Sequence, residues 1–191
     1  MARPKPDSRA PMPVAAPSGT YLRAPVRSVL THPAVVLTQR SVEVDPGDPA
    51  IVALARTLVA TMRVSPACIG LAAPQVGEPV RLFCMDVTGH KKARSQAGLV
   101  VMANPRIVTA SGTVVMREGC MSVPSLTGDV ARAAEVVVEG LEPGTCRVIR
   151  VAADAMEARC LQHEIDHLDG LVFVERVAFP EKELFARKRY A

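Results

Sequence analysis

The chain has no tryptophan, and aromatic residues make up only 3% of its 191 positions. Its core must therefore be filled by Val, Leu, Ile and Ala, which supply most of a hydrophobic fraction of 49%. The sequence also lacks an apolar run that could cross a membrane and an N-terminal signal peptide. We therefore expect one soluble, cytoplasmic domain with no membrane contact.

The net positive charge is confined to the N-terminal region. The formal net charge is +4, and residues 1–30 carry five basic side chains against one acidic side chain, so the rest of the chain is neutral overall. This distribution argues against direct, sequence-specific binding of nucleic acid. Residues 1–20 contain five prolines and are predicted to form a flexible Pro-rich extension. An organellar targeting segment is the alternative, because these residues are Arg-bearing and acid-poor.

No Cys-x-x-Cys pair occurs, and the number of cysteines is odd. The five are irregularly spaced, at Cys68, Cys84, Cys120, Cys146 and Cys160. Without an export signal, this pattern favours reduced thiols over disulfides, and one of them could ligate a metal.

The pattern that carries chemistry is His163-Glu164-Ile165-Asp166-His167. On a helix, the i,i+4 spacing places both histidines on one face, where they can reach a single metal ion. Glu164 lies beside that face and can take a proton from a metal-bound water. The alternative is an ordinary helix with two core or solvated histidines and a surface glutamate.

A catalytic site of this type needs a third protein ligand. Position 173, where a metzincin has its third histidine, is Phe173, and few carboxylates follow. Upstream, Cys120 lies between a glycine and a predicted turn, so it is a candidate thiolate ligand. A small buried thiol is the alternative for this cysteine.

The remaining pattern predicts a short list of elements. Asp48 and Pro49 begin a helix that ends before Pro66. Asp154 and Glu157 resemble a capping box that opens the histidine-bearing helix, which Gly170 closes. Other predicted elements are strands over residues 79–87, 99–108 and 113–116, a hairpin over 132–139 and 145–152, a short strand over 171–174, and a basic helix from residue 180.

Three stretches, taken together and in this order, resemble the three motifs of the peptide deformylases. They are Gly70-Leu71-Ala72-Ala73-Pro74-Gln75, Glu118-Gly119-Cys120-Met121-Ser122 and Gln162-His163-Glu164-Ile165-Asp166-His167. The resemblance extends over residues 25–178. It implies an α+β fold with antiparallel sheets packed around a central metal-binding helix, in a single catalytic domain over residues 21–191.

By this resemblance, Cys120, His163 and His167 ligate one divalent metal ion, and Glu164 handles the proton of the attacking water. Members of the family use Fe(II), and zinc, nickel or cobalt can replace it. The sequence does not choose among these ions, because a Cys-His-His site suits several of them.

The resemblance also implies roles for five further residues. The side-chain amide of Gln75 and the backbone N–H of Met121 match the family's donors to the formyl oxygen. Ile69, Gly70 and Gly119 match the positions where the substrate peptide lies as an added strand.

The reaction implied is hydrolysis of the N-formyl group from the initiator methionine of nascent polypeptides, which releases formate. The basic termini are candidate contacts with the ribosome. Two alternatives are a deformylase-like protein that binds peptides or ribosomes without turnover, and a general metallopeptidase.

For some residues around the motifs, the sequence leaves more than one role open. Glu118 and Asp166 are candidates to orient the histidines, and Arg132 is a candidate partner of Glu118. Cys160 is placed either to border the methionine pocket or only to pack. Cys68 stands where the family has glycine, so we expect either backbone strain or a thiol near the metal.

Overall fold

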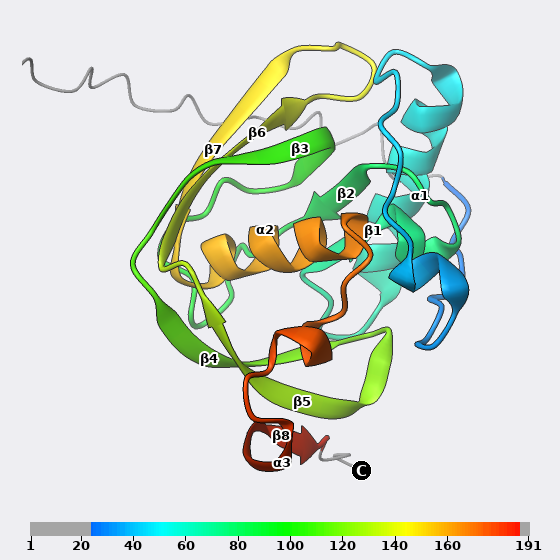
Figure 1. The fold of residues 1–191 in the computed structure, drawn as a ribbon. Helices are drawn as coiled ribbons and strands as arrows, with labels where there is room; N and C mark the ends of the chain where they lie inside the picture. The colour runs from blue at the N-terminus through cyan, green and yellow to red at the C-terminus, as the bar shows by residue number, and fades with distance from the viewer. Residues whose placement is uncertain (1–23, 188–191) are drawn as a thin grey trace, which may run out of the picture.

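The computed structural model describes residues 24–187, so the predicted flexible extension over residues 1–20 lies outside the described residues (Figure 1). Two antiparallel sheets and two long helices make up the fold. The five-stranded sheet has the order β1 (Gly70–Ala72), β2 (Leu82–Met85), β3 (Val100–Ser111), β6 (Glu135–Leu141) and β7 (Val148–Asp154). The three-stranded sheet has the order β4 (Val114–Cys120), β5 (Val123–Arg132) and β8 (Leu184–Ala186).

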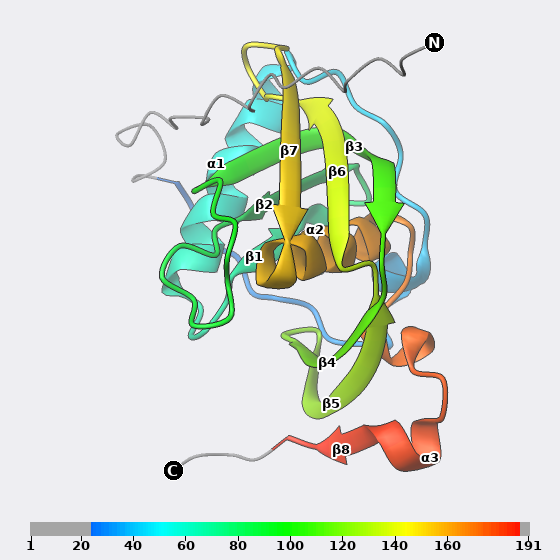
Figure 2. The same cartoon turned by 90° about the vertical axis from the view of Figure 1, so that its left-hand side faces the viewer.

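Helix α2 (Ala155–Leu168) lies between the two sheets, and α1 (Pro49–Val64) covers the other face of the five-stranded sheet (Figures 1 and 2). Both faces of the five-stranded sheet are shielded from solvent, as strand β2 shows. Its successive side chains point alternately toward α2 and toward α1. Phe83 and Met85 belong to the core cluster around α2, whereas Leu82 and Cys84 belong to the cluster around α1. The expected α+β fold with antiparallel sheets is confirmed.

Helix α1 begins where the sequence predicts. The Asp48 side chain accepts a hydrogen bond from the backbone N–H of Ala50 at 2.8 Å, and Pro49 occupies the first turn. The helix ends at Val64, two residues before Pro66, because a proline disfavours helical backbone in the residue before it.

The predicted capping box at the start of α2 is wrong. Asp154 precedes the helix, but its side chain accepts from the backbone N–H of Ser95 at 2.9 Å and makes no cap. Glu157 likewise accepts from the backbone N–H of Ala97 at 2.6 Å. Both carboxylates therefore hold the loop between β2 and β3 against the helix. Gly170 follows the helix with a φ of +78°, as its predicted closing role requires.

The C-terminal predictions are wrong except for the start of a helix at Pro180. The expected strand over residues 171–174 is a short 3-10 helix, η3 (Phe173–Arg176), which begins as the Val172 N–H donates to the Glu175 carboxylate at 2.8 Å. The expected basic helix lasts only for α3 (Pro180–Glu183), after which β8 pairs with the edge of β5. The backbone groups of the apolar run from Leu184 form hydrogen bonds in that ladder. This pairing depends on tertiary structure, which the periodicity of the sequence does not reveal.

Other short elements connect these parts. They are the 3-10 helices η1 (Val35–Thr38) and η2 (Ala73–Val76). Strand β5 was not expected, and the predicted hairpin is found as β6 and β7. Within residues 24–187, no helix has the length and apolar character needed to cross a membrane.

Candidate metal centre and its cleft

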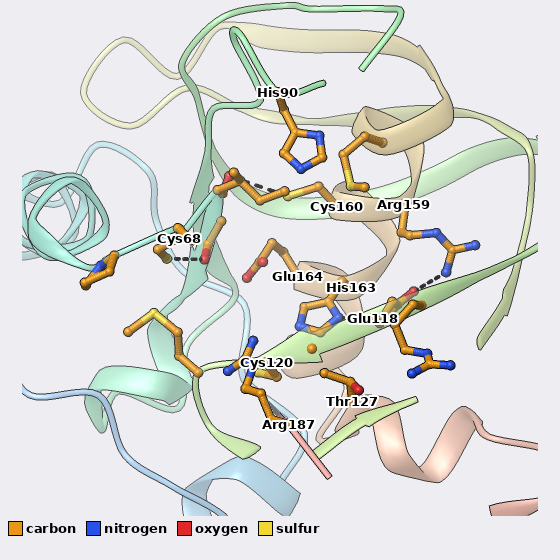
Figure 3. Close-up of a pocket in the computed structure, with 18 of the residues that line it drawn as sticks. Cys68, His90, Glu118, Cys120, Thr127, Arg159, Cys160, His163, Glu164 and Arg187 are labelled. Atoms are coloured by element: carbon orange, nitrogen blue, oxygen red, sulfur yellow. Dashed lines mark hydrogen bonds and ion pairs between the residues drawn. The ribbon is translucent and has the colours of Figure 1, made fainter. Parts of the chain in front are cut away.

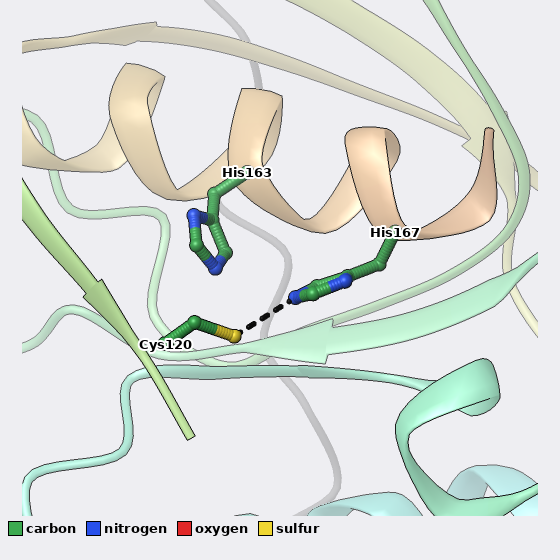
Figure 4. A group of neighbouring side chains, drawn as sticks. All are labelled: Cys120, His163 and His167. Atoms are coloured by element: carbon green, nitrogen blue, oxygen red, sulfur yellow. Dashed lines mark hydrogen bonds between the residues drawn. The ribbon is translucent and has the colours of Figure 1, made fainter. Parts of the chain in front are cut away.

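Three potential metal donors converge from two elements (Figure 4). His163 and His167 project from one face of α2, and Cys120 ends β4, where the β4–β5 register shifts and re-aims its side chain. The ligand atoms of all three lie within 4.8 Å of one another, and Cys120 Sγ is 3.1 Å from His167 Nε2. The sequence pattern and the fold therefore bring the three predicted ligands together.

The chemistry of these donors fits a divalent metal. In a tetrahedral site with bonds of roughly 2.0–2.3 Å, donors lie about 3.5 Å apart. Here Cys120 Sγ and His167 Nε2 are 3.1 Å apart, and all three donors lie within 4.8 Å of one another. Burial raises the pKa of Cys120, but the two histidines lower it by more, so the net pKa is well below the ordinary thiol value. The arrangement thus favours the thiolate that a metal requires.

A buried carboxylate orients the first histidine. Glu118 Oε2 lies 2.9 Å from His163 Nδ1, which leaves Nε2 of that ring for a metal. Glu118 also accepts from Arg132 at 2.8 and 3.0 Å and from Arg159 at 2.5 Å. The predicted pairing of Glu118 with Arg132 is therefore present.

Asp166 has a different role from the one expected. No hydrogen bond joins it to His163 or His167 among the described residues. It accepts from Arg132 at 2.5 Å and from Arg176 at 2.6 Å. Asp166 therefore acts on the metal site only indirectly, by fixing Arg132.

Glu164 lies on the same helix and is only 3% exposed. Burial raises its pKa to about 7, although the neighbouring His163 and His167 act in the opposite direction. Its Oε2 has no hydrogen-bond partner within the described part of the chain. A carboxylate with these properties can hold and release a proton near neutral pH.

The side chain of Gln75, which belongs to η2, also lies beside the metal donors. Its Oε1 accepts from the Ala72 N–H at 2.9 Å, which turns its amide nitrogen toward Ser122 Oγ at 3.1 Å and Cys120 Sγ at 3.6 Å. Met121 follows Cys120 and also lines the cleft. Both predicted oxyanion donors are therefore next to the metal donors.

A cleft of about 1020 Å³ opens over these groups (Figure 3). Ile69 and Gly70 line one side and Gly119 lines another. Strand β1 begins at Gly70, and β4 contains Gly119. Each is the terminal strand of its sheet, so each has an edge without a strand partner among the described residues. Such edges can pair with an extended peptide.

Cys68 does not strain the backbone, since the positive φ of +56° belongs to Ala67. The Cys68 thiol lines the cleft and donates to the carbonyl of Gly70 at 3.1 Å. Burial, with a smaller contribution from the charge of Glu164, raises its pKa to about 12. Cys160 also borders the cleft, 3.6 Å from the Ile69 carbonyl.

The sequence analysis missed two arginines and a histidine that line the cleft: Arg159, Arg187 and His90. Arg159 could have been found, because it lies one helical turn before His163 on the same face. Arg187 gave no signal, because the pairing of β8 with β5 places it there. His90 lies in the loop after β2, and none of the three motifs includes it.

Comparison with known proteins agrees with this geometry. A family model described as "Polypeptide deformylase" matches residues 26–183. A peptide deformylase of Syntrophobacter fumaroxidans is 36% identical over 163 residues, covering 85% of this chain and 93% of that protein. The crystal structure of peptide deformylase from Ehrlichia chaffeensis has a TM-score of 0.75 at 33% identity, covering 83% of this chain and 91% of that one.

A further solved structure is titled a Met-Ala-Ser bound class I type b peptide deformylase from Acinetobacter baumannii. It has a TM-score of 0.72 at 30% identity and covers 81% of this chain and 100% of that one. With a family match over most of its length and relatives of this similarity, the chain belongs to the peptide deformylase family.

Proposed function

We propose that Cys120, His163 and His167 hold one divalent metal ion, and that Glu164 is the proton carrier in removal of the N-formyl group from nascent peptides. The observation that carries this proposal is a buried carboxylate oxygen without a partner, next to three convergent metal donors. The natural substrate is a formylmethionyl chain, which would place the protein in the cytoplasm. The non-catalytic alternative has no supporting observation.

The metal we propose is Fe(II), with zinc, nickel and cobalt as substitutes that the same donors accept. When bound, such an ion supplies a Lewis acid that lowers the pKa of water and polarises a carbonyl. A thiolate and two neutral imidazoles balance a divalent charge to a net +1. This donor set leaves a fourth position for water or substrate.

Glu164 would take a proton from the attacking water and deliver it to the amine that leaves with the peptide. A pKa of about 7 suits both steps, because the group can exist in either protonation state near neutral pH. Burial excludes bulk water that would otherwise compete for the proton.

The formyl oxygen gains negative charge in the transition state and needs donors that already point toward it. We assign this role to the Gln75 side-chain amide and the backbone N–H of Met121. The Ala72 N–H fixes the orientation of the Gln75 amide through its oxygen. Loss of one such donor typically costs about 3 kcal/mol of transition-state stabilisation.

The peptide itself would lie extended between the free edges of β1 and β4, pairing with the backbone of Ile69, Gly70 and Gly119. Main-chain pairing accepts many downstream sequences, as a general processing enzyme requires. The Met-Ala-Ser peptide bound to the Acinetobacter protein supports a tripeptide as a sufficient test substrate.

The decisive test is formate release from formyl-Met-Ala-Ser by protein loaded anaerobically with Fe(II) or Ni(II). The Glu164→Ala variant should lose at least about 100-fold in kcat, because a positioned acid–base group contributes about 10²–10⁴-fold. Its metal content should equal that of the parent. Equal turnover by parent and variant would refute the role of Glu164, and no turnover by the metal-loaded parent would favour the binding-only alternative.

The basic termini remain candidate ribosome contacts. Co-sedimentation with ribosomes at low and high salt, with and without residues 1–23, would test this contact, which predicts salt-sensitive binding that the truncation weakens.

A further inference from the structure

The mouth of the cleft contains an arginine that none of the three motifs includes. Arg187 directly follows β8, and its backbone N–H donates to the Ser125 carbonyl at 2.8 Å, which anchors it beside β5. Its guanidinium lies across Gly119, because a Cβ built on that glycine would be 2.6 Å from Arg187 Nη2 and 3.3 Å from Cζ. The absence of a side chain at Gly119 therefore makes room for the guanidinium.

The neighbouring arginine is already neutralised. Arg117 donates twice to Asp129, at 2.7 and 3.2 Å, and its guanidinium lies 3.5 Å from the centre of the Phe185 ring. Arg187, in contrast, has no ion pair with any carboxylate of residues 24–187. Among residues 24–187, Arg187 is therefore a cation at the mouth of the cleft that no carboxylate neutralises.

The carboxylates deeper in the cleft do not balance this charge. Glu118 is held by two arginines and a histidine, and Glu164 is buried against the metal donors. The free guanidinium is instead next to the backbone of Gly119, one residue before the Cys120 ligand. A peptide paired with the edge of β4, with its formyl group at the metal donors, would pass Gly119 within the first two residues after its methionine.

We propose that Arg187 binds a carboxylate of the substrate just downstream of the formylmethionine, and so gives the enzyme a preference for acidic residues there. This proposal rests on the proposed function. A guanidinium matches a carboxylate with two parallel hydrogen bonds. The carboxylate can come from an Asp or Glu side chain or from the C-terminus of a short peptide.

The preference is modest and sensitive to salt, because the pair lies at an exposed rim. We expect a roughly 3- to 10-fold higher kcat/KM for an acidic than for a basic third residue at low ionic strength, expressed mainly in KM. Added salt should reduce the ratio.

The test compares formyl-Met-Ala-Asp, formyl-Met-Ala-Ser and formyl-Met-Ala-Lys, all with amidated C-termini, and formyl-Met-Ala-Ser with a free C-terminus. The Arg187→Ala variant should abolish the Asp-over-Lys preference, and Arg187→Glu should reverse it. Arg56→Ala is the matched control, because Arg56 is exposed on α1 and does not line the cleft. It should leave the preference unchanged.

The amidated peptides and the peptide with a free C-terminus distinguish a side-chain carboxylate from a C-terminal one. An effect of Arg187 on the Asp peptide supports side-chain recognition, and an effect confined to the free C-terminus supports recognition of short peptides. An Asp-to-Lys ratio and a free-to-amidated ratio that are the same in the parent, Arg187→Ala and Arg187→Glu would overturn the proposal.

Binding of the deformylated peptides Met-Ala-Asp-amide and Met-Ala-Lys-amide, measured by calorimetry, separates this proposal from the proposed function. A parent that binds the Asp peptide more tightly through Arg187, yet releases no formate, would support the subsite and refute the enzyme activity. Equal binding of both peptides by parent and variants would count against the subsite even in an active enzyme.

Discussion

Replacing Gly70 with alanine places a methyl group against Glu164, the residue that we propose as the proton carrier. A Cβ at this position would be 2.3 Å from Glu164 Oε1 and 2.8 Å from Cys160 Sγ. Because non-bonded heavy atoms of this kind prefer about 3.5 Å, the carboxylate must move by about 1 Å. Glu164 is 3% exposed, so the surrounding core restricts its retreat.

A displacement of about 1 Å at a reacting group can reduce the rate by about 100-fold, equivalent to about 2.7 kcal/mol in the activation free energy. We therefore expect kcat/KM for formyl-Met-Ala-Ser to fall by about that factor in Gly70→Ala. The metal content should not change, because none of the three donors is among the nearest atoms to the added methyl group.

Gly47→Ala is the matched control. Its added Cβ would approach nothing nearer than 3.3 Å, at Asp45 and Cys146, and the site is remote from the cleft lining. Its kcat/KM should stay within twofold of the parent. If Gly70→Ala retained more than about a fifth of parental kcat/KM with full metal content, the argument that Glu164 must occupy this position would fail.

Three further predictions concern charge and thiols. Arg132→Met leaves the buried carboxylates Glu118 and Asp166 without a shared cation, so urea unfolding should show a loss of about 3–5 kcal/mol, and a loss under 1 kcal/mol would contradict it. Burial raises the pKa of Glu118, but hydrogen bonds from His163 and Arg132 lower it by a larger amount, so the net pKa is well below its usual range. The metal-free protein should therefore lose stability as the pH falls below about 4.3, the unfolded value, and a flat urea midpoint between about pH 6 and 3.5 would contradict this. Because the pKa of Cys68 is about 12, iodoacetamide at about pH 8 should label exposed Cys146 first, and equal labelling rates by peptide mass mapping would contradict it.

The sequence is most informative where the relevant contacts are local. The spacing of His163 and His167 fixes their common helix face, and the caps of α1 at Asp48 and Pro49 depend only on near neighbours. Predictions failed where tertiary partners compete with local ones. Asp154 satisfies a distant loop instead of its own helix, and Leu184 joins a strand ladder instead of a helix.

The cleft was predictable only in part for the same reason. The three motifs identify Gln75, Glu164 and the metal donors, but the width and charge of the opening depend on how β8 packs on β5. Arg187 is 67 positions from Cys120 in the sequence, and no spacing rule links them. Thr127 and Phe185 line the opening through the same pairing.

Ion pairs, and not the metal alone, connect the strand of the thiolate to the helix of the histidines. Glu118 on β4 binds Arg159 and His163 of α2 and also Arg132 of β5. The donor cage is therefore preorganised by the folded chain, in contrast to a zinc finger, whose metal must supply the folding free energy. An incoming ion therefore need not spend its binding energy on ordering the polypeptide.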